Sequence, residues 1–401
     1  MSSMALLFVT VPLITALIGW ITNWAAVKMI FYPQKFRGIG PIGWQGILPR
    51  NATGFALDVA QTLTEKLVSP RELAKRLDPA EMEKLLEDSL ESESDEIVRD
   101  AAERLQRGAW DQLPAPTRAM IVGQVRQETK QVARDIFDRL QGISDELLDL
   151  RALVVSELSG RNTGKLVRLF QEIGARELRF IEYYGGVFGF FIGLGQVAAW
   201  SWLQVWWIMP IVGVIVGLVT NYLAIQMIFR PLERTRYLGV PYQGMFPKRQ
   251  LEISKDYARI TADEVLTAKN LIRLVAEGEA GERIAEVVVT TISERLVEIS
   301  AKAQALVPVE ITPAMIDEVK AVVVERLQRS IPDFQPQLEE YLDRKLDIGT
   351  TIETKLSRLS KHEFERILRG LFEKDEFMLI VIGGVLGGAV GCLQALLVVT
   401  L

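Results

Sequence analysis

Polar side chains that could bind a substrate occur inside two long apolar stretches of this sequence. Thr22 and Asn23 lie in the first stretch, and Thr220 and Asn221 lie 198 positions further on in another. If these stretches are membrane helices, a hydroxyl and an amide there must bond across helices or line a wet path. Helix-to-helix bonding is the simpler interpretation. A pair of pseudo-symmetric substrate ligands is the alternative.

Other polar residues accompany these pairs. Lys28 and Gln226 follow them at equivalent positions and differ in charge, which weakens the case for two equal sites. Gln196 and Gln394 each follow a row of glycines spaced by four residues. The rows are Gly185, Gly189 and Gly193, and then Gly383, Gly387 and Gly391. Glycines at this spacing let helix backbones approach closely, so we expect helix packing there.

Motifs for catalysis are incomplete. Gly160–Lys165 resembles a phosphate loop, but its glycines are one position too close and Leu166 replaces the magnesium-binding hydroxyl. The single histidine, His362, has no second histidine four residues on, and the single Cys392 excludes a disulfide or a cysteine zinc site. We therefore predict no catalytic residues, no metal and no cofactor. An enzyme that works through Asp/Glu pairs is the remaining alternative.

The whole chain reads as a tandem duplication. The motif Thr-Asn-x-x-Ala-x-x-Met-Ile-Phe-x-Pro starts at Thr22 and Thr220, and Gln-Gly-x-x-Pro starts at Gln45 and Gln243. The glycine rows keep the same offset of 198 residues. This offset defines repeat units at 1–203 and 204–401.

Charged residues are excluded from three parts of the chain. None occurs before Lys28, between Glu182 and Arg230, or after Glu376. Charge-free apolar runs of about 20 residues can cross a bilayer as helices, and the central run is long enough for two. The sequence therefore predicts an all-α membrane protein with transmembrane helices at 1–31, 183–204, 205–229 and 377–401. Each repeat has two such helices around a long helical soluble domain, and the domains are 32–182 and 230–376.

The polar segments show helical spacing of apolar residues throughout, with one continuous face expected over residues 126–158. Turn signals at 78–79, 114–116, 308 and 332–336 should divide them into several helices. We find no convincing strand pattern. The spacing does not decide whether the helices enclose a closed core or an open groove.

Gly/Pro-rich loops are expected at 33–50 and 231–249, directly after two of the membrane helices. They combine aromatic and basic residues, a composition suited to anionic headgroups. The candidate lipid-contacting residues are Arg37, Trp44, Arg50, Arg236, Tyr242, Lys248 and Arg249. The alternative is a plain turn that reverses the chain.

These motifs, together with the stretch Arg176–Gln196, resemble the bacterial membrane family known as domain of unknown function 445. The resemblance covers nearly the whole chain and implies a bacterial membrane protein without an established activity or known catalytic residues. Because Lys and Arg flank the helices on the side of the polar segments, we expect both soluble domains to be cytoplasmic.

We therefore expect a non-enzymatic, multi-pass inner-membrane protein that acts as a scaffold or handles lipid. An oligomeric transporter or channel that uses the Thr/Asn pairs is the alternative. Membrane lipids and a second copy of the chain are the expected partners, and no nucleic acid is expected.

Overall fold

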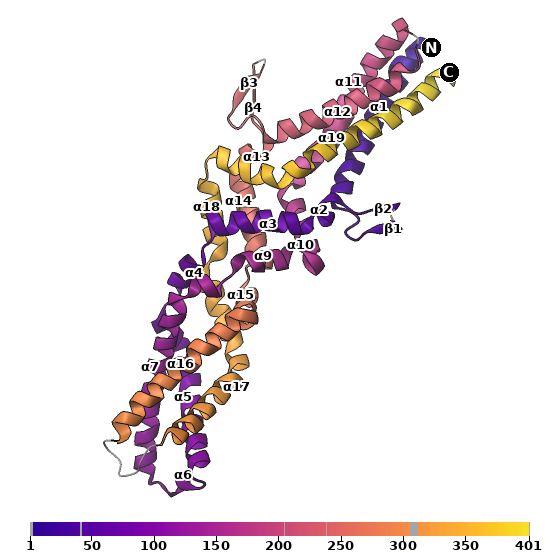
Figure 1. Ribbon diagram of the computed structural model, residues 1–401. Helices are drawn as coiled ribbons and strands as arrows, with labels where there is room; N and C mark the ends of the chain where they lie inside the picture. Colours follow the sequence, from indigo (N-terminus) through magenta and orange to yellow (C-terminus); the bar gives the residue numbers. More distant parts are fainter. Residues whose placement is uncertain (1–2, 41, 204, 238, 305–311, 401) are drawn as a thin grey trace. The chain divides into compact units, whose positions relative to one another are not determined.

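The structure is a computed structural model that describes residues 3–40, 42–203, 205–237, 239–304 and 312–400. These residues form an all-α protein with two short β-hairpins (Figure 1). The chain divides into two compact units. Unit 1 comprises Met1–Leu67, Val154–Val265 and Gly349–Leu401, and unit 2 comprises Val68–Leu153 and Leu266–Ile348.

This division differs from the expected pair of separate soluble domains, 32–182 and 230–376. Each polar segment contributes to unit 1 at its ends and to unit 2 in its middle. The reason lies in burial, because the long helix α7 (Ala115–Gly142) has no fully buried residue. The buried apolar residues of unit 2, such as Ile97, Ile292 and Val322, come from both copies.

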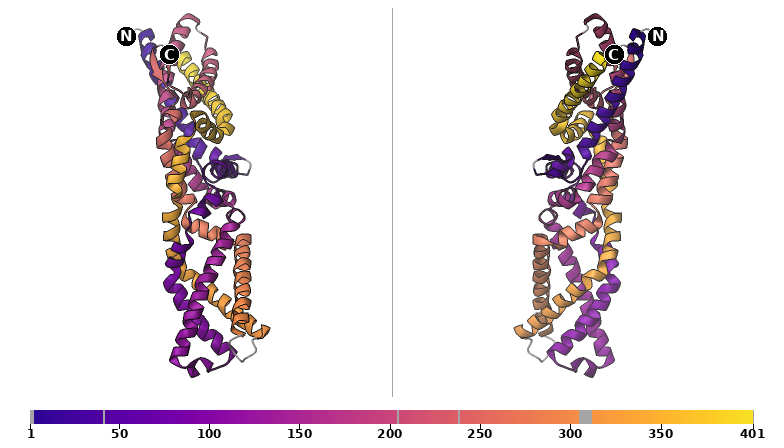
Figure 2. Two further views of the ribbon diagram at one scale, coloured as in Figure 1. Left: turned by 90° about the vertical axis from the view of Figure 1, so that its left-hand side faces the viewer. Right: turned by 90° about the vertical axis from the view of Figure 1, so that its right-hand side faces the viewer.

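Unit 1 contains four long helices that run along one another (Figures 1 and 2). Helix α1 pairs with α11 and α12 pairs with α19, and further contacts join α1 to α19 and α11 to α12. The bounds of these helices are α1 (Ser3–Phe31), α11 (Ala175–Leu203), α12 (Ile208–Phe229) and α19 (Lys361–Thr400).

The glycine rows lie in the contacts within the two helix pairs. A Cβ atom added to Gly19 would lie 2.3 Å from the carbonyl oxygen of Gly185, and one added to Gly217 would lie 2.0 Å from that of Gly383. Similar contacts recur along both rows, at Gly189 and Gly193 and at Gly387 and Gly391. The backbones therefore touch directly, as small residues at four-residue spacing allow.

Shorter elements complete unit 1. They are β1 (Arg37–Ile39), β2 (Ile42–Trp44), α2 (Ile47–Arg50), α3 (Ala52–Thr62), π-helical η1 (Leu63–Leu67), α9 (Leu150–Leu158), η2 (Gly160–Asn162), α10 (Thr163–Ile173), β3 (Thr235–Tyr237), β4 (Val240–Tyr242), α13 (Met245–Lys248), α14 (Gln250–Ile260), π-helical η3 (Thr261–Val265) and α18 (Ile348–Arg358). Helix α9 begins in unit 2, and α18 begins at its last residue.

The two loops that follow α1 and α12 contain antiparallel hairpins, β1–β2 and β3–β4, where the sequence indicated loops without strands. Strands of three residues are too short to show an alternating pattern. Both loops are closed in the same way. The side-chain amide of Gln45 donates to the carbonyl of Gln34, and that of Gln243 donates to the carbonyl of Leu232. The backbone of Gly46 packs against the end of α1, where a Cβ would meet Phe31 at 2.7 Å.

Unit 2 consists of helices that pack mainly as α5 with α7, α5 with α17, α7 with α16 and α16 with α17 (Figure 2). Its elements are α4 (Pro70–Arg76), α5 (Pro79–Leu105), α6 (Ala109–Gln112), α7, α8 (Ser144–Leu147), α15 (Ala268–Ala276), α16 (Gly278–Gln304) and α17 (Pro313–Leu346). The breaks predicted at 78–79 and 114–116 are confirmed, since α5 begins at Pro79 and α7 begins at Ala115.

Two predictions about these helices are wrong. Helix α17 continues through Pro332 and Pro336, because Val322 and Tyr341 anchor it by burial on either side of the prolines. The face expected over 126–158 is not one helix, since α7, α8 and α9 divide that stretch. The break expected at Pro308 lies outside the described residues.

Among the described residues, two helical segments are long and apolar enough to cross a membrane, namely Phe8–Phe31 and Ile208–Phe229. Helix α19 contains a shorter apolar stretch, Ile380–Leu396. All four long helices turn large apolar side chains outward. Leu17, Phe191, Ile215 and Leu396 are each more than half exposed, and apolar surface of this extent marks contact with lipid or protein.

Candidate functional site

The predicted polar residues of the long helices meet at the centre of unit 1. A narrow cavity of about 50 Å³ lies where the four helices face one another. Its polar lining residues are Thr15, Thr22, Asn23, Gln196, Thr220 and Gln394. The glycines of both rows supply much of the remaining wall, because they leave the helix backbones bare.

Most of these polar groups are bonded within the protein. The Asn23 amide donates to the carbonyl of Ile181 at 2.8 Å, which links α1 to α11. The hydroxyls of Thr22 and Thr220 donate to carbonyls of the preceding turn, at 3.1 Å to Gly19 and at 2.8 Å to Val216. Hydrogen bonding inside the bundle thus accounts for these three residues.

A polar link joins the first long helix to the last. The Gln394 amide of α19 donates to the Thr15 hydroxyl of α1 at 2.6 Å, and Thr15 donates to the Val11 carbonyl at 2.7 Å. The equivalent glutamine of the first half, Gln196, is 5 % exposed, and its Oε1 makes no hydrogen bond with any described residue. The two glutamines therefore differ, although they occupy matching positions.

The remaining intramembrane candidates lie outside this cavity lining. Asn221 is buried against the second helix pair, where a Cβ on Gly383 would lie 2.3 Å from its amide nitrogen. Gln226 is half-buried near the end of α12. Lys28 is exposed, with its ammonium 5.8 Å from the centre of the Tyr32 ring.

Lys28 lines an open recess at the end of α1. The recess has a volume of about 490 Å³, and Arg37 of strand β1 also lines it. Met29, Tyr32, Pro33 and Gln34 complete the lining. At the adjacent hairpin tip Ile39 is 90 % exposed and Ile42 is 82 % exposed. The basic recess therefore lies next to an exposed apolar tip.

The other loop candidates separate into two groups. Arg50, Arg236 and Lys248 are exposed, as Arg37 is, and none of them forms an ion pair with a described residue. Trp44 and Tyr242 are half-buried instead. The Tyr242 hydroxyl donates to the Met227 carbonyl, and the Trp44 indole N–H is buried without a hydrogen bond to a described residue.

Arg249 belongs to neither group, because its side chain forms ion pairs inside the fold. Its guanidinium lies 2.6 Å from a carboxylate oxygen of Glu177, which is 2 % exposed, and 3.0 Å from Glu252. Burial opposes the charge, but the hydrogen bonds with Glu252 and Glu177 outweigh it and raise the pKa of Arg249 above its ordinary value. Arg249 therefore fixes the start of α14 to α11.

The sequence reasoning missed Thr15 and Glu177. The sequence did contain a signal for Thr15. The residue 198 positions after Thr15 is Gly213, so the hydroxyl that binds Gln394 has no counterpart for Gln196. Glu177 lies near the charged start of α11, where its burial follows only from the tertiary contact with Arg249.

Apolar outward faces, glycine-packed helices and a central cavity whose described lining carries no charged residue define an all-α membrane protein. The chain belongs to the family described as "Protein of unknown function (DUF445)", whose profile matches residues 13–138 and 211–338. The resemblance drawn from the motifs is thereby confirmed.

Similar proteins carry the name UPF0754 membrane protein. The one from Bacillus velezensis is 33 % identical over 162 residues, which are 35 % of this chain and 41 % of that protein. The one from Shouchella clausii is 41 % identical over 76 residues, 18 % of this chain and 19 % of that protein. The chain thus spans less than half of the length of each of these relatives. No solved structure matches the chain.

Proposed function

We propose that this protein is a non-enzymatic, multi-pass protein of the bacterial inner membrane that binds anionic lipid at the membrane surface, as a scaffold or in lipid handling. The observation that carries the proposal is the recess between Lys28 and Arg37, beside the exposed apolar tip of β1–β2. Two cations there can bind one phosphate, while Ile39 and Ile42 enter the acyl region.

Four membrane spans are part of this proposal. If α1 crosses the bilayer, α11 must lie at the same depth, because its glycines contact α1 at Gly19, Thr15 and Pro12. These contacts cover about 10 Å of helix at a rise of ~1.5 Å per residue. The same reasoning pairs α19 with α12.

The proposed orientation in the membrane follows from the basic residues that flank these helices. Lys28, Arg230 and Lys248 all lie on the side of the polar segments. We therefore place unit 2 in the cytoplasm. Single cysteines at Val297 and Trp202, both exposed, test this placement in a Cys392→Ala background. An impermeant maleimide should label position 202 in intact spheroplasts and position 297 only after lysis. Labelling of position 297 in intact spheroplasts would reverse the placement.

The second half supplies a matched control for the recess. At the offset of 198 residues Gln226 replaces Lys28 and Thr235 replaces Arg37, so Lys28→Gln with Arg37→Thr makes the first half resemble the second. Each basic residue near a charged surface contributes ~1 kcal/mol, so this pair should change affinity by about thirtyfold.

The test compares phosphatidylglycerol with phosphatidylcholine on the delipidated full-length protein, using native mass spectrometry. We expect the wild type to retain phosphatidylglycerol preferentially and the double variant to lose most of this preference. Arg151→Thr, which changes an exposed arginine of α9 outside both loops, should leave it intact. Equal retention of the two lipids by the wild type would reject the proposal.

An oligomeric transporter or channel is the second candidate, because polar side chains from all four helices line the central cavity. Four helices leave only about 50 Å³ there, so a pathway would require several copies of the chain. Asn23→Leu and Asn221→Leu test this function in cells. If a variant with both changes folds and keeps the cellular phenotype, the transporter candidate fails.

A further inference from the structure

The two halves of the sequence also meet outside the long-helix pairs, at two equivalent contacts within unit 1. Helix α10 of the first half contacts α14 of the second half, and the start of α19 contacts α3 in the same way. At the offset of 198 residues α14 matches α3, and α10 matches the start of α19. A first half therefore has two possible partners, namely a second half and the first half of another copy of the chain.

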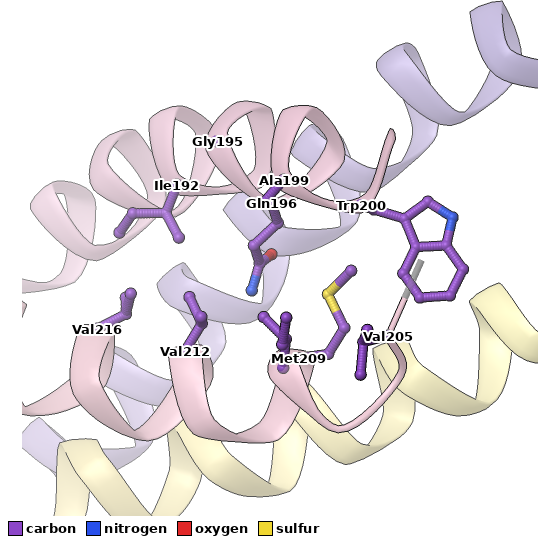
Figure 3. Close-up of a pocket in the computed structure, with 10 residues that line it drawn as sticks. Ile192, Gly195, Gln196, Ala199, Trp200, Val205, Met209, Val212 and Val216 are labelled. Carbon is purple, nitrogen blue, oxygen red and sulfur yellow. The ribbon is translucent and has the colours of Figure 1, made fainter. Parts of the chain in front are cut away.

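The apolar contacts between the long helices do not distinguish these partners. Figure 3 shows Ile192 of α11 facing Val212 and Val216 of α12. The residues of the first half that match these two valines are Ile14 and Ile18, which are also apolar. Apolar attraction is not directional, so another first half would offer similar contacts. A preference for one partner must come from other residues.

Four ion pairs join the first half to the second around α10 and the start of α11. They are Arg168 with Glu264 at 2.7 Å, Glu172 with Arg259 at 2.8 Å, Arg176 with Glu252 at 2.8 Å and Glu177 with Arg249 at 2.6 Å. The first residue of each pair belongs to the first half, and its partner belongs to the second half. Glu177 is the buried member of the set, so its charge depends most on its partner.

The first half does not contain equivalents of these four partners. The residues that match Arg249, Glu252, Arg259 and Glu264 are Asn51, Gly54, Gln61 and Lys66. Three of them are uncharged, and Lys66 has the opposite charge. Another first half would therefore leave Glu177 buried without a counter-charge and would place Lys66 beside Arg168. An unpaired buried charge and neighbouring like charges both oppose association.

The charge reversal at Lys66 is accompanied by a second reversal. The Lys165 ammonium donates to the carbonyl of Glu264 at 2.8 Å, and the residue that matches Lys165 is Glu363. Hydrogen bonds from Ser360 lower the pKa of Glu363, and the positive charge of Lys66 lowers it further. Opposite charges thus face one another at both contacts between unlike halves, whereas like halves would bring like charges together.

We infer that the charged face formed by Arg168, Glu172, Arg176 and Glu177 is a selective surface, which accepts a second half and rejects the first half of another copy of the chain. The selection acts mainly through the first half, because Lys374 and Asp375 of the second half keep the charges of Arg176 and Glu177. The surface is separate from the recess at Lys28, so either proposal can fail while the other stands.

The test exchanges residues between the equivalent faces of the full-length protein and measures chemical unfolding in mixed micelles. One variant presents the charged face with the residues of a first half, through Arg249→Asn, Arg259→Gln and Glu264→Lys. Its folding equilibrium constant should fall more than about a hundredfold, because Glu177 loses its counter-charge.

The matched control makes the opposite exchanges on the other face, through Asn51→Arg, Gln61→Arg and Lys66→Glu. All three positions are exposed, and Asp375 has the same charge as Glu177. The folding equilibrium constant should therefore change by less than about tenfold. Equal losses from the two sets of exchanges would overturn the inference.

A double-mutant cycle keeps the test decisive if the first variant does not fold. Glu264→Lys and Arg168→Glu should each lower the folding equilibrium constant by up to about fivefold, since both residues are at least partly exposed. The combination restores opposite charges, so its loss should be smaller than the product of the two single losses. Single losses that simply multiply in the combination would overturn the inference.

Discussion

The helix pairs α1–α11 and α12–α19 share their backbone contacts and differ in their polar side chains. Gly19 meets Gly185 as Gly217 meets Gly383. By contrast, the Gln394 amide is bonded to Thr15, while Oε1 of Gln196 is buried without a hydrogen-bond partner among the described residues. The matching glycine contacts hold the helices together, and the polar contacts distinguish the two halves.

The same difference continues at the ends of these helices. Lys28 and Arg37 form a basic recess, and Gln226 and Thr235 occupy the equivalent positions in the second half. Arg249 binds a buried carboxylate, and its equivalent is Asn51. Residues that are identical in the two halves thus form the shared framework of the helices. Residues that differ between the halves mark positions where each half has its own contacts.

The largest effect is expected at the buried ion pair of Arg249 with Glu177, because the residue equivalent to Arg249 in the first half is the uncharged Asn51. Arg249→Met leaves the carboxylate of Glu177, 2 % exposed, without its counter-charge. This change should lower the free energy of unfolding by about 3–5 kcal/mol. The matched change Asn51→Met alters an exposed side chain that makes no capping hydrogen bond, and its effect should stay within about 0.5 kcal/mol. Chemical unfolding in mixed micelles measures both, and equal losses would contradict the assignment.

The glycine contacts should respond equally in the two halves. Gly19→Ala and Gly217→Ala place a methyl group 2.3 Å and 2.0 Å from a facing carbonyl oxygen, so each helix pair must separate. We expect each variant to lose about 3 kcal/mol, the upper end for overpacking. Gly195→Ala is the control, since nothing lies within 4 Å of its added Cβ. A large loss of stability for only one of the two variants would contradict the equivalence of the two helix pairs.

The two glutamines should respond in opposite directions. Gln394→Leu removes the bond to Thr15 and should lower stability by ~1 kcal/mol. Gln196→Leu removes a buried acceptor without a partner and should leave stability unchanged or raise it. Unfolding in lipid-free detergent distinguishes these outcomes. Equal destabilisation by both changes would show that the two sites are alike.

The smallest effect concerns an exposed ion-pair network that links α10 to α14. Hydrogen bonds from Arg168 and Arg259 lower the pKa of Glu172. Because the folded pKa is depressed, the contribution of Glu172 is complete above its unfolded pKa of ~4.3 and is lost as pH falls through the folded value. Glu172→Gln should cost ~0.2–1 kcal/mol at neutral pH. The difference from wild type should disappear in strong acid, and a difference that persists there would contradict the ionic origin.

Much of unit 1 could be predicted from the sequence. Apolar runs, glycines at four-residue spacing and the offset of 198 residues indicate long helices with matching contacts. The pattern does not show which helices pair, because a glycine row fits any small facing surface. The pairing of α1 with α11 follows from contacts such as Gly19 with Gly185, which only the folded chain reveals.

Unit 2 was harder to predict, because its helices have incomplete apolar faces. The sequence assigned each polar segment a core of its own, whereas the buried residues Ile97, Ile292 and Val322 are drawn from both segments. Helix α17 also continues through Pro336, where local propensity predicts a break. Tertiary packing decided both outcomes.

The candidate sites were partly visible. Lys28 and Gln196 were identified as polar residues of apolar segments. The sequence did not show that Arg37 lines the same recess as Lys28, or that Gln196 lacks the hydroxyl partner of Gln394. Arg249 was expected to contact lipid, and a distant buried carboxylate binds it instead.

The interleaving of unit 2 has a consequence for how the protein is made. Helices α5 and α7 leave the ribosome long before their partners α16 and α17, which begin at Gly278 and Pro313. At about 5–20 residues per second, a delay of 198 residues corresponds to roughly 10–40 s. During that interval the incomplete face of α7 is open to cellular factors, so newly made chains should depend on chaperones in a way that the finished protein does not.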